Sequence, residues 1–185
     1  MARTHARILC SIWDDPDFQE ATPMEQRLYV LLLSQDSLSN CGRLALTVKR
    51  WSNGCTSTTP AEIRKALAGL DARRFVVVDE DTEEVLIRSF IRNDGIVKQP
   101  QMMKSALREA LLVKSLRLRA VLAGELRRLR REDAAFTAEQ IDPGWDPDPD
   151  PAPDSDDDSP IQAQDSLLDD CGQPSGTVNG ASVQA

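Results

Sequence analysis

The 185-residue sequence has few of the side chains that catalytic and metal sites use. It contains one histidine, His5, and four cysteines, of which no two are closely spaced. Zinc sites and disulfide frameworks require close-spaced Cys and His, so neither is indicated and we expect reduced thiols. No glycine-rich phosphate loop and no Ser or Cys nucleophile motif occurs in the sequence. We therefore expect a protein that is not an enzyme and that binds no metal or cofactor.

Long apolar runs and an export signal are also missing. A membrane-spanning helix needs roughly 18 consecutive apolar residues, and no run in the sequence approaches that length. The apolar stretch at residues 8–13 is short and is followed at once by Asp14 and Asp15, which does not fit a secretory signal. We expect a cytoplasmic protein without a membrane partner.

Basic side chains are absent from residues 134–185, which carry 12 acidic residues. Residues 1–133 hold all 22 Lys and Arg together with 18 acidic residues, a net charge of +4. Aspartate and proline alternate over residues 146–151, a composition that cannot bury an apolar core. We predict a disordered acidic tail over residues 134–185. This tail either competes with anionic partners for the basic part of the chain or only increases solubility, and both interpretations stay open.

Two segments begin with the same helix-start signal, a Thr followed by Pro and, two residues later, by Glu. They run from Thr22 to Glu25 and from Thr59 to Glu62. The Thr side chain can accept the N–H of the Glu, and the Glu carboxylate can accept the N–H of the Thr. Proline at the first helical position loses no needed donor. These capping boxes predict helices over residues 23–35 and 60–73.

The segments between and after these helices complete an order of elements. We expect a short strand, a short helix and the two strands of a hairpin, at residues 43–46, 48–53, 74–78 and 83–92. Helix, strand, short helix, helix and hairpin is the order of a winged helix-turn-helix domain, an α+β fold. Helix 60–73 is then the recognition helix, whose exposed face fits the DNA major groove.

The winged helix-turn-helix domain is expected to span residues 1–99 and to be followed by a basic helical extension over residues 100–133. Within the extension, an apolar stripe recurs at helical spacing, formed by Leu118, Leu122, Leu126 and Leu129. The stripe can pack on the winged-helix domain or on a second copy of the chain. A homo-oligomer therefore stays open.

The candidate DNA-binding residues are basic and hydroxyl side chains of the recognition helix, its surroundings and the N-terminal arm. Arg64 and Lys65 are expected on the exposed face of helix 60–73, and Lys49 and Arg50 beside the flanking DNA backbone. Hydroxyl groups crowd the start of that helix, where free backbone amides suit a phosphate. The complete set is Arg3, Arg7, Lys49, Arg50, Thr56, Ser57, Thr58, Thr59, Arg64, Lys65 and Arg73.

The hairpin turn is acidic where many winged helices carry bases. Five carboxylates occur within residues 79–84, and phosphates would repel them. Either DNA binding relies on the recognition helix, the N-terminal arm and the basic C-terminal helix, or the hairpin contacts a protein partner. The sequence allows both alternatives.

Short motifs in the first hundred residues are shared with a known family. In chain order they are MAR at 1–3, IWDDPDF at 12–18, TP at 22–23, RLY at 27–29, GRL at 42–44, AL at 66–67 with Leu70, FIRN at 90–93 and KQ at 98–99. Together they resemble the DnaD-like N-terminal domain of phage and prophage replisome-organiser proteins, among them actinobacterial phage forms. The resemblance implies a winged-helix domain that binds origin DNA and helps to load the replicative helicase. The match weakens past Pro100.

Three functional hypotheses follow. The first is sequence-directed binding of double-stranded DNA in phage or prophage replication initiation, at the nucleoid of the bacterial host, with a replicative helicase or primase as partner. The second is transcriptional regulation by a protein of the same fold. The third is a protein-interaction adaptor that uses the acidic hairpin turn and the tail.

Overall fold

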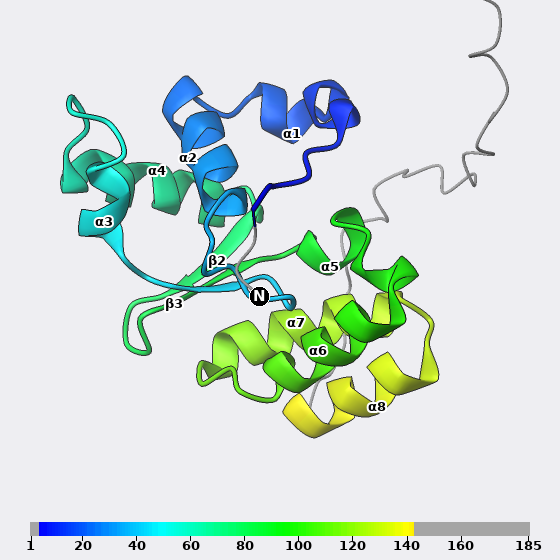
Figure 1. The fold of residues 1–185 in the computed structure, drawn as a ribbon. Coiled ribbons are helices and arrows are strands. Elements are labelled where there is room, and N and C mark those ends of the chain that lie inside the picture. The colour runs from blue at the N-terminus through cyan, green and yellow to red at the C-terminus, as the bar shows by residue number, and fades with distance from the viewer. Residues whose placement is uncertain (1–3, 143–185) are drawn as a thin grey trace, which may run out of the picture. The chain divides into compact units, whose positions relative to one another are not determined.

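Residues 4–142 are described by a computed structural model, in which helices surround a small antiparallel sheet (Figure 1). The first elements are the 3₁₀ helix η1 (Cys10–Asp14), α1 (Pro16–Gln19), α2 (Pro23–Leu33), β1 (Arg43–Ala45), α3 (Val48–Ser52), α4 (Pro60–Ala72), β2 (Val76–Asp79) and β3 (Glu84–Ile87). The last elements are α5 (Phe90–Asn93), the 3₁₀ helix η2 (Ile96–Lys98), α6 (Pro100–Ala110), α7 (Leu116–Arg128) and α8 (Glu132–Ile141). The α+β class predicted from the sequence is confirmed, and the arrangement is compatible with a winged helix.

The sheet has the strand order β1-β3-β2, so β3 is its central strand. Leu86 of β3 lies opposite Arg43 of β1 on one side and Val77 of β2 on the other. All four residues of β3 are buried, because helices cover both faces of the sheet. In Figure 1, α4 lies above the sheet and contacts β2, whereas α7 lies below it and contacts β2 and β3.

Both predicted capping boxes are present. The Thr22 side chain accepts the N–H of Glu25, and the Glu25 carboxylate accepts the N–H of Thr22 at 2.7 Å. Thr59 and Glu62 repeat this pair at the start of α4, again at 2.7 Å for the N–H of Thr59. The local start signals were therefore sufficient, and α2 and α4 end two residues and one residue before the predicted ends.

The second hairpin strand is shorter than predicted. It ends at Ile87 rather than at residue 92, and residues 90–93 form the single-turn helix α5. Beyond Ile87 the N–H of Arg88 still donates to the Phe75 carbonyl at 3.2 Å, but the ladder goes no further, because β3 is paired there with the first residues of β1 and β2, Arg43 and Val76. Phe90 and Ile91 of α5 are both buried in the core. Their composition is typical of a strand, so the sequence did not predict this helical turn.

The predicted start of the acidic tail is wrong for residues 134–141. These residues belong to α8, which buries Ala134, Ala138 and Ile141 against α7. The spacing of these small and apolar residues is helical, but the acidic composition of residues 134–185 as a whole obscured it. The remainder of the predicted tail, residues 143–185, lies outside the described residues.

Buried carboxylates join the C-terminal helices to the sheet. Glu84 of β3 accepts hydrogen bonds from the backbone N–H groups of Lys114 and Ser115, at 3.0 and 2.9 Å, and from the Arg43 guanidinium at 2.9 Å. The Ser115 hydroxyl donates to the Asp79 carboxylate. Residues 4–99 and the expected extension are thus parts of one folded unit.

A second buried carboxylate, Glu125 of α7, joins the same helix to the segment that leaves the sheet. It receives guanidinium groups of Arg88, Arg92 and Arg128 at 2.9, 3.1 and 3.1 Å. The leucine stripe predicted from the sequence lies on the same helix. Leu118, Leu122 and Leu126 are buried within the chain, and Leu129 is partly buried. The stripe is therefore explained by packing inside one chain.

Candidate nucleic-acid interface

A groove lies where α3, the exposed face of α4 and the hairpin turn meet. It has a volume of about 580 Å³. Its charged lining comes from all three places, namely Lys49 and Arg50 of α3, Arg64 of α4, and Glu80 and Glu83 of the turn. We call it the α3–α4 groove, and we call residues 80–83, between β2 and β3, the wing turn. The structure thus brings together three of the predicted basic residues.

Helix α4 presents its bases to solvent because its other face fills the core. Ile63, Leu67 and Leu70 are at most 3% exposed, whereas Arg64 and Lys65 are exposed. Within residues 4–142, Arg64, Lys65 and Lys49 have no ion pair or side-chain hydrogen bond. These three cations are consequently available to an anionic partner.

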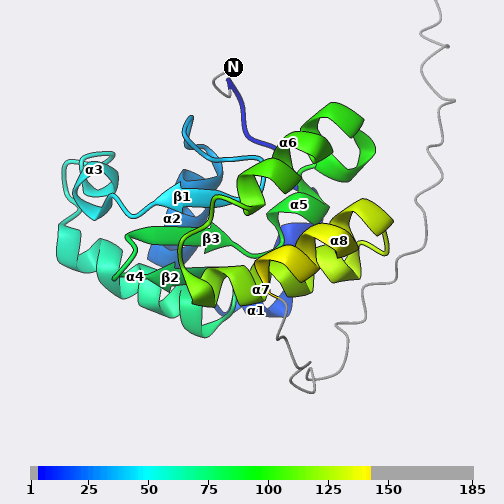
Figure 2. The same ribbon diagram turned by 90° about the horizontal axis from the view of Figure 1, so that it is seen from below.

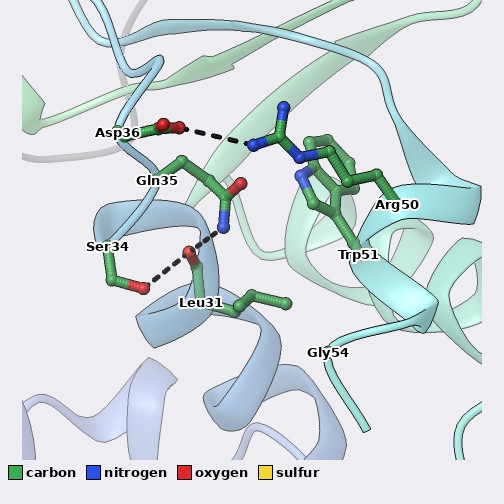
Figure 3. Close-up of a pocket in the computed structure, with 7 residues that line it drawn as sticks. All are labelled: Leu31, Ser34, Gln35, Asp36, Arg50, Trp51 and Gly54. Carbon is green, nitrogen blue, oxygen red and sulfur yellow. Dashed lines mark hydrogen bonds and ion pairs between the residues drawn. The ribbon is translucent and has the colours of Figure 1, made fainter. Parts of the chain in front are cut away.

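Arg50 stands between the α3–α4 groove and a second, smaller hollow of about 300 Å³ at the end of α2 (Figure 3). Its guanidinium lies 3.6 Å from the carboxylate of Asp36, and both side chains are more than 60% exposed. Exposed pairs of this kind contribute about 0–1 kcal/mol. Arg50 can therefore exchange Asp36 for a phosphate at little cost.

The hydroxyl residues before α4 are used inside the chain more than the sequence suggested. The Thr59 side chain accepts the N–H of Glu62, and the Glu62 carboxylate lies at the helix start, where it accepts the Thr59 N–H. The Thr58 hydroxyl accepts from Arg27, and Ser57 is bonded to the Cys55 thiol. The Glu62 carboxylate thus occupies the start of α4, where the sequence predicted free amides that would bind a phosphate. Among the four hydroxyls, Thr56 is exposed and has no partner in the described part of the chain.

Arg27 is a cation near this loop that the sequence analysis missed. It belongs to α2, and its guanidinium lies 3.5 Å from the Thr58 hydroxyl. The sequence does not indicate that a base of α2 lies beside the loop before α4, because the contact depends on how α2 packs against α4. Arg27 adds positive charge beside the loop that leads into α4.

Two other predicted bases in the described part of the chain lie away from the groove. Arg73 follows the last residue of α4, and its guanidinium pairs with Glu20 at 3.3 Å and Glu25 at 3.7 Å. Arg7 packs against Gly95, which comes shortly after α5, and α5 lies well away from α3 in both views (Figures 1 and 2). Arg3 lies outside the described residues. The site is therefore smaller than the predicted set.

The five carboxylates of residues 79–84 divide into two groups. Asp79 and Glu84 point inward, toward α7. The Ser115 hydroxyl and the N–H of Thr82 lower the pKa of Asp79. Burial opposes ionisation of Glu84, but the N–H groups and the Arg43 guanidinium together hold its pKa below the ordinary value. The other three, Glu80, Asp81 and Glu83, are exposed.

Other kinds of site find little support in the part of the chain that is described. No group of three His, Cys, Asp or Glu residues among residues 4–142 is arranged to hold a metal ion. Cys10, Cys41 and Cys55 are free thiols. Hydrogen bonds from Ser57 and Thr58 lower the pKa of the Cys55 thiol to about 7, without a His or carboxylate partner that would make a nucleophilic pair.

The helices of residues 4–142 include none with both the length and the apolar character needed to cross a membrane.

Comparison with known proteins found no matching family model, no matching curated protein and no matching solved structure. The assignment of function therefore depends on the residues of this chain.

Proposed function

We propose that the protein is a winged helix-turn-helix protein that binds double-stranded DNA through α4. The observation that supports this most is the exposed face of α4, where Arg64 and Lys65 have no acidic partner among residues 4–142. Some bases elsewhere in the chain are neutralised, as Arg73 and Arg88 are, whereas others, such as Lys104 and Arg108 of α6, are also exposed without an acidic partner among residues 4–142. In a helix-turn-helix domain the helix that follows the short one enters the major groove, so the bases on the exposed face of α4 are the ones placed to contact DNA.

The dimensions and chemistry of α4 suit a major groove. Its 13 residues make a helix about 20 Å long, and the major groove is about 12 Å wide and admits one helix. Arg64 can donate two hydrogen bonds to guanine O6 and N7, and Lys65 can donate to the same edge. Lys49 and Arg50 lie on α3 beside the groove, where they can contact phosphates and fix the orientation of α4.

Initiation of phage or prophage DNA replication is the biological role that we propose for this binding. It is supported by the resemblance of residues 1–100 to replisome-organiser proteins, and it makes a replicative helicase or primase the expected protein partner. Transcriptional regulation would use the same face of α4. The position of the bound fragments, at a replication origin or at promoters, separates the two roles.

An adaptor function is the second candidate, and the exposed carboxylates of the wing turn favour it. Glu80, Asp81 and Glu83 form a compact acidic surface that a basic protein segment could bind. In that case DNA binding is weak at all sequences and does not depend on Arg64 or Lys65.

The test is a mobility-shift titration of the full chain with fragments of the surrounding genome at two salt concentrations. The variant Arg64→Ala/Lys65→Ala removes the proposed base contacts. Each such contact is worth about 1–3 kcal/mol, so we expect the affinity for the preferred fragment to fall at least about tenfold. The matched control is Lys104→Ala/Arg108→Ala, which removes the same two residue types from the exposed face of α6.

The proposal predicts that certain fragments shift at low protein concentration, that the α4 variant loses this shift, and that the α6 variant keeps it. A shift that ignores fragment sequence and is equally reduced in both variants would contradict it. Absence of any shift would favour the adaptor.

A further inference from the structure

The α3–α4 groove contains charges of both signs. Lys49, Arg50 and Arg64 line it from the helices, and Glu80 and Glu83 line it from the wing turn. DNA that contacts these bases must bring its phosphates close to the two carboxylates. This arrangement differs from a uniformly basic surface, on which every nearby group attracts phosphate.

Hydrogen bonds between the backbone of the wing turn and neighbouring residues hold the turn in place. The Asp79 carboxylate accepts the N–H groups of Asp81 and Thr82 at 3.0 and 3.1 Å. Glu83 has a left-handed conformation with φ of 53°, and its carbonyl accepts the N–H of Leu46 at 2.7 Å. Leu46 directly precedes Thr47, the N-cap residue of α3. The wing turn is therefore hydrogen-bonded to the segment that leads into α3, the helix that carries Lys49 and Arg50.

Glu80 and Glu83 have no structural use among residues 4–142. Their side chains form no ion pair or hydrogen bond there, in contrast to Asp79 and Glu84, which join α7 to the sheet. They are therefore not explained by the fold. Their position in the groove suggests an electrostatic effect on what binds there.

We propose that Glu80 and Glu83 weaken the binding of DNA phosphates in the α3–α4 groove, so that duplexes of every sequence dissociate more readily. This inference rests on the proposed DNA-binding function. Charges within about 8–10 Å of one another are incompletely screened at physiological salt, and both carboxylates share the groove with the bases. Because the repulsion acts on phosphates, it does not depend on base sequence, and a duplex without favourable base contacts is held least.

The experiment uses the full chain and a fluorescent 20-base-pair duplex of random sequence, which requires no knowledge of the target site. Anisotropy titrations over a series of salt concentrations compare the wild type with Glu80→Gln/Glu83→Gln, which keeps side-chain size and backbone conformation. A matched control, Asp14→Asn/Glu132→Gln, removes two exposed carboxylates from η1 and α8, which lie away from the groove (Figure 1). The α4 variant Arg64→Ala/Lys65→Ala is titrated in parallel.

The wing-turn variant is expected to bind about three to ten times more tightly at low salt, with a steeper loss of affinity as salt rises. The control is expected to change affinity less than twofold. Unchanged or weaker binding by the wing-turn variant, while the α4 variant still loses affinity, would overturn this inference and leave the proposed function standing. If binding does not depend on Arg64 and Lys65 in any background, the proposed function fails and this inference fails with it.

Discussion

At the scale of single residues, the role of each charge is decided by its neighbours. Arg64 and Arg73 belong to the same helical segment, but Arg73 lies beside Glu20 and Glu25 whereas Arg64 faces the groove. The sequence predicted the exposed face of α4 correctly, because helical periodicity separates it from the apolar face. It could not predict the partners of Arg73, since Glu20 is 53 positions away along the chain.

Glu84 provides the clearest residue-scale prediction. It is 3% exposed and accepts hydrogen bonds from Lys114, Ser115 and Arg43. Glu84→Gln removes the charge that Arg43 faces and at least one acceptor, so we expect the free energy of unfolding at pH 7 to fall by about 2–4 kcal/mol. Urea unfolding of both proteins measures this difference.

The same pair of proteins carries a pH test. Since the pKa of Glu84 is lowered in the folded protein, its stabilising contribution is complete above the ordinary carboxyl pKa of about 4.3 and is lost as pH falls through the lowered value. The difference between wild type and Glu84→Gln should be constant above about pH 5 and should shrink on further acidification. Glu132→Gln, an exposed control, should differ little from the wild type throughout. A Glu84 variant as stable as this control would show that the buried contacts contribute nothing.

At the scale of elements, predictions from local signals were confirmed and predictions that needed tertiary contacts were not. The capping boxes of α2 and α4 involve residues three apart, so the sequence alone specifies these helix starts. The C-terminal limit of β3 depends on where its antiparallel neighbours β1 and β2 begin. The helical state of residues 132–141 depends on burial against α7. Composition averaged over a long segment cannot report either contact.

The dependence of the sheet on α6–α8 gives a prediction for truncation. A chain that ends at residue 99 lacks the N–H donors of Lys114 and Ser115, so Glu84 loses two of its hydrogen bonds, and the face of the sheet that α7 covers becomes exposed. Apolar surface left exposed on that face is strongly destabilising, because its burial is the main favourable contribution to folding. We expect this fragment to show no cooperative urea transition.

A chain that ends at residue 142 is the control for this truncation, and we expect it to unfold in one transition like the full chain. Circular dichroism follows both unfolding curves. If the 1–99 fragment unfolded cooperatively at the urea midpoint of the 1–142 chain, residues 1–99 would be an independent domain and the contacts of Glu84 would be dispensable.

At the scale of the whole molecule, the distribution of charge matters more than its sum. The formal net charge is −8, which by itself argues against a nucleic-acid partner. Residues 1–133 nevertheless carry an excess of bases, and many of those bases are paired within the fold, as Arg43 and Arg88 are. The cations without ion pairs in the described part of the chain include Lys49 and Arg64, which line one groove, and Lys65, which is exposed on the same helix as Arg64.

The candidate site was predictable in its centre and not at its edges. Lys49, Arg50 and Arg64 were predicted from the order of elements and are found around one groove. Arg27 was missed, and Arg7 lies elsewhere, because both positions depend on how distant segments cross. Residues 79–84 were known to be acidic, but only the fold separates the two carboxylates that hold α7, Asp79 and Glu84, from the two that line the groove, Glu80 and Glu83.

The central claim is that duplex DNA binds to the face formed by α3 and α4. The most direct test is amide chemical-shift mapping of the ¹⁵N-labelled full chain on addition of a short duplex at low salt. If DNA binds to this face, the largest shifts occur in α3, in residues 53–59 and in the first half of α4, with α6 and α8 unaffected. Shifts confined to the C-terminal helices, or no shifts at all, would contradict it.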